Sequence, residues 1–178
     1  MRDRFPIVCH RELRPRWRWS AWRERRHPLI AGRGQVLVHN VEGAYTTGTA
    51  DPARRTAVTL VDVRPGMSVS AHWKVRTLYG GGFSVTVRLR CTVVDPAEVT
   101  RSRREGSPWN VRRVLAQDPR PRGLEWKYSP GDEDLLRLAL TAPLQARPTL
   151  RDIAGVRVEL AEVSVWMRYR NDDDDNEA

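Results

Sequence analysis

Cysteine is scarce in this chain of 178 residues, which contains only Cys9 and Cys91. The two lie far apart in the sequence, so they indicate neither a disulfide framework nor a zinc site. Long apolar runs are also missing, since no stretch approaches the ~20 apolar residues that a membrane-spanning helix needs. The first residues lack the apolar segment of a signal peptide. We therefore expect a cytoplasmic protein that does not cross a bilayer.

Signatures of catalysis are missing as well. The sequence has no Ser-His-Asp order, no nucleophile elbow and no pair of carboxylates that suggests a glycosidase. The glycines at 80–82 lack the Lys-Ser or Lys-Thr pair of a phosphate-binding loop, and no further metal ligands stand near Cys9 and His10. The acidic run 172–175 would attract cations only diffusely, because such a run holds no fixed geometry. These absences predict a protein that is not an enzyme and has no cofactor or metal.

Charge, by contrast, is abundant and unevenly distributed, with a formal net charge of +9. Residues 1–26 hold nine Arg against three acidic residues, giving +6, whereas residues 171–178 hold five acidic residues, giving −5. The length and the 40% of hydrophobic residues are typical of one globular domain. We therefore divide the chain into a basic Trp/Arg-rich N-terminal arm at 1–28, a single α+β domain at 29–170 and an acidic, disordered tail at 171–178.

Tryptophan is concentrated in the arm, where the segment RPRWRWSAWRERRHP holds three of the seven tryptophans and six arginines. Tryptophan favours the bilayer interface, and arginine is attracted to anionic surfaces. A membrane or anion contact is therefore predicted at Arg16, Trp17, Arg18, Trp19, Trp22, Arg23, Arg25 and Arg26. On a helix Trp17 would lie about 140° from Trp22, so no single apolar stripe forms. Three interpretations stay open: an interfacial anchor, a nucleic-acid-binding arm, and a strap packed on the domain.

Alternating apolar residues predict strands in the central part of the chain. The predicted strands span 34–40, 57–63, 67–75 and 83–95. In the last of these, every second residue from Phe83 to Val93 is apolar, as in an antiparallel strand with one buried face. The glycines at 80–82 predict a hairpin loop before it.

After Asp95-Pro96 the spacing of the apolar residues changes from the two-residue period of a strand to a helical one. Helices are predicted at 96–105, at 109–117 and from the acidic turn 132–134 onward, with a loop at 118–131. The third helix should end near Thr141 or kink at Pro143. A final strand at 155–167 changes phase near Ala161, which predicts a β-bulge. The fold class is therefore α+β, with a mostly antiparallel sheet followed by a short helical segment and a final long strand.

Two short motifs resemble a known family. Val93-Val94-Asp95-Pro96 ends the long predicted strand, and Gly155-Val156-Arg157-Val158 opens the final one. In this order they resemble the SPFH domain of the band 7, prohibitin and stomatin-like proteins, over roughly residues 33–167. The resemblance implies a non-catalytic scaffold that associates with a membrane face and with copies of itself. The chain departs from the family pattern because it shows no membrane anchor and no C-terminal coiled coil, which puts ring or cage assembly in doubt.

Two functional hypotheses follow. The first is an SPFH-like scaffold or adaptor, peripheral to the inner face of a membrane, which acts through self-association or a partner protein. The second is a soluble nucleic-acid-binding protein that uses the arm, together with a strand face carrying Arg88 and Arg90. A third possibility is that the chain is a subunit of a larger assembly with its arm wrapped around a neighbour. This possibility predicts binding to neither lipid nor nucleic acid.

Overall fold

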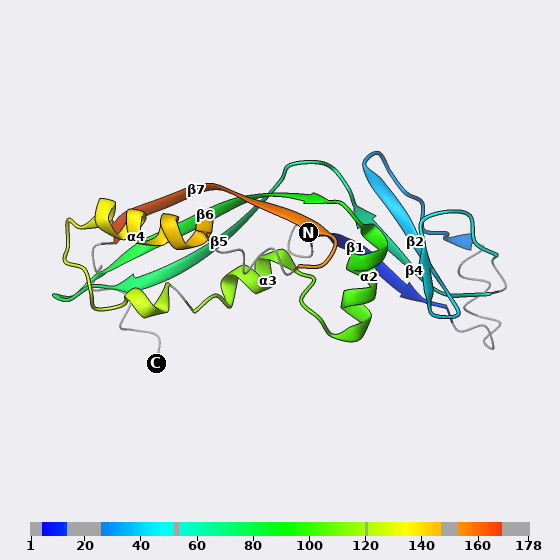
Figure 1. Cartoon of the computed structure of the whole chain (residues 1–178), viewed down its shortest axis with the longest axis horizontal. Coiled ribbons are helices and arrows are strands. Elements are labelled where there is room, and N and C mark those ends of the chain that lie inside the picture. The colour runs from blue at the N-terminus through cyan, green and yellow to red at the C-terminus, as the bar shows by residue number, and fades with distance from the viewer. Residues whose placement is uncertain (1–4, 14–25, 52–53, 120, 147–152, 169–178) are drawn as a thin grey trace.

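The computed structural model describes residues 5–13, 26–51, 54–119, 121–146 and 153–168. Within them the fold is α+β, as predicted, with two antiparallel sheets, three α-helices and a final long strand. The sheets follow one another along an elongated molecule, with the longer sheet at the left of Figure 1 and the smaller one at the right.

The small sheet has the strand order β1-β4-β2-β3. Its strands are β1 (Ile7–Glu12), β2 (Gln35–Val41), β3 (Ala44–Thr46) and β4 (Arg55–Asp62). β1 falls within the predicted arm, yet it pairs with β4 and buries Ile7 in the core. Residues 7–12 are therefore part of the folded domain, because pairing with a distant strand decides their structure.

The long sheet consists of β5 (Met67–Arg76), β6 (Gly82–Val93) and β7 (Val156–Arg168), with β6 in the centre. A five-residue loop joins β5 and β6, since Arg76 pairs with Gly82, so the predicted hairpin is confirmed. On β7, Glu162 pairs with Arg88 and Leu160 with Leu89, which makes Ala161 the extra residue of the predicted bulge.

The described helices are α2 (Pro96–Glu105), α3 (Val111–Ala116), α4 (Glu133–Ala146) and the 3-10 turn η1 (Arg122–Leu124). α3 and α4 pack on the inner face of the long sheet, against β5 and β7, whereas α2 packs on β2 and β3 of the small sheet. Leu136, Leu140 and Leu144 lie one helical turn apart on α4, and all three are buried in the same core as the inner face of β6. Because this apolar stripe reaches past Pro143, α4 does not end near Thr141 but continues to Ala146.

The two motifs of the family resemblance lie in contact. The carbonyl oxygen of Gly155 accepts hydrogen bonds from the N–H groups of Val94, at 2.9 Å, and Asp95, at 3.1 Å. The Asp95 carboxylate in turn caps α2 by accepting from the backbone N–H groups of Ala97 and Glu98. The corner that ends β6 and the start of β7 therefore form one structural unit.

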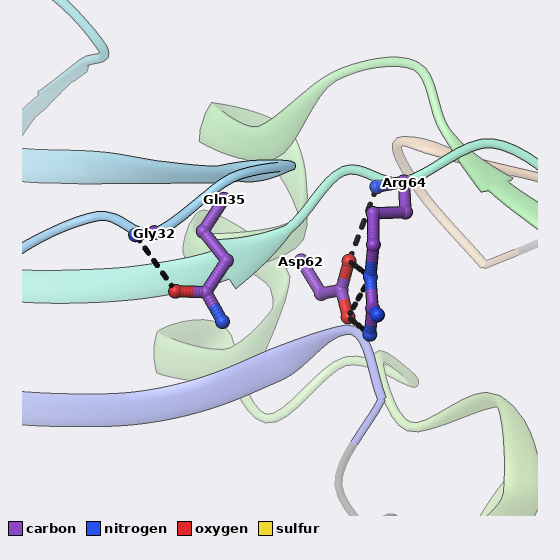
Figure 2. Close-up of polar contacts among 4 residues, drawn as sticks. All are labelled: Gly32, Gln35, Asp62 and Arg64. Carbon is purple, nitrogen blue, oxygen red and sulfur yellow. Dashed lines mark hydrogen bonds and ion pairs between the residues drawn. The ribbon is translucent and has the colours of Figure 1, made fainter.

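An ion pair between the buried Asp62 and the half-exposed Arg64 lies where the chain passes from the small sheet to the long one (Figure 2). Asp62 is 5% exposed, and Oδ1 of its carboxylate accepts from Nε of Arg64 at 2.9 Å and from the backbone N–H of Arg64 at 3.1 Å. Burial acts to raise the pKa of this carboxyl, but the hydrogen bonds and charge of Arg64 outweigh burial, so the pKa is lowered. Arg64 also lies over Gly34, where a Cβ would come within 2.3 Å of its Cγ. In the turn into β2, the side-chain oxygen of Gln35 accepts from the N–H of Gly32 at 3.1 Å (Figure 2).

Candidate functional site

Three segments that carry the most exposed aromatic residues of the described chain meet at one end of the long sheet, at the left of Figure 1. Tyr79 is 80% exposed and Trp126 is 51% exposed, while Leu78 and Trp166 are each about half exposed. We call these four residues the aromatic tip. They come from the β5–β6 loop, the segment after η1 and the end of β7, so tertiary structure alone brings them together.

The loop that presents Leu78 and Tyr79 is shaped by glycine. Gly80 and Gly81 have φ angles of +87° and +77°, which side chains with a Cβ rarely adopt. Thr77 is buried at the base of the loop, and its hydroxyl donates a hydrogen bond to the carbonyl oxygen of Gly80. Because the base of the loop is fixed and the glycines have no side chains to cover them, Leu78 and Tyr79 remain exposed to solvent.

Backbone hydrogen bonds join the segment that carries Trp126 to the same loop. The N–H of Trp126 donates to the carbonyl oxygen of Arg76 at 3.0 Å, and the N–H of Leu78 donates to the carbonyl oxygen of Tyr128 at 3.0 Å. The guanidinium carbon of Arg76 lies 5.7 Å from the centroid of the Trp126 ring, within the range of a cation–π interaction. Trp126 itself has a φ of +63°, which is unusual for a large residue and shows how closely the surrounding contacts determine its position.

Basic side chains that have no acidic partner among the described residues lie beside the tip, on the face of the long sheet opposite α3 and α4. Across the three strands, Lys74 lies opposite Ser84, and Ser84 lies opposite Trp166. In the next row, Arg76 lies opposite Gly82 and Gly82 opposite Arg168. These rows therefore place long cationic or aromatic side chains on both edge strands, with a serine and a glycine between them. We call Lys74, Arg76 and Arg168 the basic rows.

On the other half of this open face, acidic side chains lie beside the basic ones, so positive and negative charges are more nearly equal. There Arg88 forms an ion pair with Glu162 at 3.0 Å, and Arg90 lies opposite Glu159 on β7. The stretches of β5, β6 and β7 nearest the tip, residues 72–76, 82–86 and 164–168, contain no acidic residue. Positive charge on the open face is thus concentrated beside the aromatic side chains.

Most of the predicted contact residues lie outside the described part of the chain: Arg16, Trp17, Arg18, Trp19, Trp22, Arg23 and Arg25. Arg26 is described and is exposed. Next to it, the carbonyl oxygen of His27 accepts a hydrogen bond from the guanidinium of Arg11 on β1 at 2.8 Å. The described neighbours of the predicted contact therefore belong to the small sheet, away from the aromatic tip.

Among the described residues, nothing resembles a metal or thiol site. No three His, Cys, Asp or Glu side chains of this part of the chain lie close enough to hold a metal ion together. Cys9, on β1, and Cys91, on β6, are free thiols, and burial raises the pKa of Cys91 to about 12. A thiol with so high a pKa is a packing group rather than a nucleophile at neutral pH.

The described helices are all too short or too polar to cross a bilayer. Comparison with protein-family models, with curated proteins and with solved structures gives no match.

Proposed function

We propose that this protein is a non-catalytic, SPFH-like scaffold or adaptor that binds the inner face of an anionic membrane peripherally, with the aromatic tip as a contact site. The observation that carries the proposal is the position of Leu78, Tyr79, Trp126 and Trp166 beside the basic rows. Exposed apolar groups next to uncompensated positive charge favour a lipid interface over plain water.

Aromatic and basic side chains would contribute to membrane binding in different ways. Tryptophan and tyrosine are favoured at the interface because their rings are apolar and each carries one polar group. Each Lys or Arg near an anionic surface contributes about 1 kcal/mol, so the three side chains of the basic rows add about 3 kcal/mol at low salt. Their attraction to lipid headgroups would be screened by salt, whereas the apolar contribution would persist.

The Trp/Arg-rich arm is a second contact under this proposal. Its described flanks lie on the small sheet, at the end of the molecule away from the aromatic tip. The protein would therefore touch the membrane at the tip alone, or at both ends with the long axis parallel to the surface. Self-association or a cytoplasmic partner would use the remaining surface.

Vesicle flotation tests the proposal. Full-length protein is expected to float with vesicles that contain phosphatidylserine, to bind less to phosphatidylcholine alone, and to be partly retained at high salt. The double variant Leu78→Ser/Tyr79→Ser should lose the salt-resistant part. The matched control Ile30→Ser/Val94→Ser removes two apolar side chains that are also exposed, one before β2 of the small sheet and one after the end of β6 that lies away from the tip, and should float like the wild type.

Two other outcomes would count against the proposal. If both double variants float as well as the wild type, the tip does not contact lipid. If the protein ignores vesicles but binds single-stranded nucleic acid with an affinity that falls steeply with salt, the open face and the arm serve the alternative function of nucleic-acid binding.

A further inference from the structure

A second site lies on the small sheet, beneath α2. There a pocket of about 630 Å³ is lined by residues of β1, β2, β3, β4 and α2 and by Trp109. Pockets of this size accommodate a small organic molecule. The pocket shares no residue with the aromatic tip.

Two arginines on the last turn of α2 make the pocket electropositive. Arg103 and Arg104 both line it, and within the described chain neither guanidinium has a hydrogen bond or ion pair. The acidic residue of the lining is Glu12, at the exposed end of β1. At His10 the positive charge of Arg103 has a larger effect than the negative charge of Glu12, and together with burial, the largest cause, it lowers the pKa of the imidazole.

Four other polar side chains of the pocket are held in place by hydrogen bonds. Nδ1 of His10 lies 2.8 Å from the hydroxyl of Thr59, and Oδ1 of the buried Asn40 accepts from the hydroxyl of Thr56 at 2.6 Å. Thr100 donates to the carbonyl oxygen of Pro96 at 2.9 Å. These side chains are therefore fixed before any ligand arrives, whereas Arg103, Arg104 and the buried hydroxyl of Tyr45 have no partner among the described residues.

The pocket also offers flat apolar surfaces. Trp109 and Tyr45 both line it, and both are half-buried with one side packed against the core. The guanidinium of Arg101 lies 5.8 Å from the centroid of the Tyr45 ring on the outside of the lining, which helps to fix that ring. An aromatic body placed here would stack on Trp109 while its charged group reaches the arginines.

We infer that this pocket binds a small aromatic anion whose phosphate or carboxylate is held by Arg103 and Arg104 and whose ring lies on Trp109. Arginine suits this role because its planar guanidinium donates two parallel hydrogen bonds to such a group. The inference stands independently of membrane binding, since it uses the opposite end of the molecule.

Calorimetric titration with phenyl phosphate, inorganic phosphate and phenol tests it. Phenyl phosphate should bind saturably and more tightly than phenol or inorganic phosphate. In Arg103→Gln and in Arg104→Gln its affinity should fall at least 10-fold, because each variant loses charge-assisted hydrogen bonds to the phosphate. Trp109→Leu should remove the preference for phenyl phosphate over inorganic phosphate.

Arg90→Gln, on the open face of the long sheet, is the matched control and should bind like the wild type. Circular dichroism checks that each variant is folded. If one of the two arginine variants does not fold, the other variant still tests the inference. The inference is overturned if phenyl phosphate does not bind saturably, or if a folded Arg103→Gln or Arg104→Gln binds it as tightly as Arg90→Gln does.

Discussion

Single residues at the turns hold this fold together, and Gly155 is the clearest case. Its φ is +76°, and a Cβ there would lie 2.3 Å from the carbonyl oxygen of Asp95. Gly106 has a nearly identical φ of +75° but nothing within 4 Å. We expect Gly155→Ala to lower the free energy of unfolding by about 2–4 kcal/mol, from backbone strain plus steric overlap, and Gly106→Ala by about 1 kcal/mol from strain alone. Urea denaturation of the two variants measures the difference, and equal losses would contradict the close packing at Asp95.

The Asp62–Arg64 pair makes stability depend on pH. Because the pKa of Asp62 is lowered in the folded state, its contribution is complete above the ordinary carboxyl pKa of about 3.9 and declines as the pH falls from there through the lowered pKa. Asp62→Asn should therefore be less stable than the wild type at neutral pH, and the gap should shrink by about pH 3. Chemical denaturation at the two pH values gives the result. A gap that stays constant would mean that the carboxylate is not stabilised by Arg64.

At the scale of the elements, the two halves of the open face should differ in function. Replacing Lys74 and Arg76 by Gln removes two uncompensated charges beside the tip, which should weaken binding to phosphatidylserine vesicles at low salt by roughly 30-fold. Replacing Arg90 and Arg157 by Gln removes two charges from the half that contains Glu159 and Glu162, and should have a smaller effect. Equal effects would indicate a diffuse electrostatic attraction rather than a contact at the tip.

The elements also show what local sequence can and cannot predict. The bounds of α2 are predicted because Asp95 and Pro96 are local signals that start a helix, and the bulge at Ala161 is predicted because it breaks a strict alternation. β1 and β3 are missed, since β1 buries only Ile7 deeply and β3 is three residues long. The division of the strands between two sheets is likewise set by pairing partners far along the chain.

The candidate sites are hidden for the same reason. Leu78, Trp126 and Trp166 stand in three separate segments, and only folding brings them to one end of the sheet. A hairpin loop at Gly80 is predictable, but the exposure of the side chains around it is not. The pocket at Arg103 depends on residues from five elements. The Trp/Arg-rich arm, in contrast, is conspicuous in sequence because its composition is local.

At the scale of the whole molecule, the elongated shape separates two surfaces with different expected partners. The aromatic tip ends the long sheet, whereas the pocket beneath α2 and the described flanks of the arm belong to the small sheet (Figure 1). A protein bound to the membrane by its tip would keep the pocket open to the aqueous phase. Phenyl phosphate should therefore bind equally well with and without phosphatidylserine vesicles, as calorimetry on vesicle-bound protein would show. A marked loss of affinity on vesicles would mean that the small sheet faces the lipid.

The central claim is that the aromatic tip contacts the membrane, and hydrogen exchange read by mass spectrometry tests it most directly. Exchange is compared for the full chain alone, with phosphatidylcholine vesicles and with vesicles that also contain phosphatidylserine. We predict slower exchange in peptides covering 77–82 and 124–128 when phosphatidylserine is present, and no change in β4. Slower exchange confined to residues 14–26, or no change anywhere, would contradict the claim.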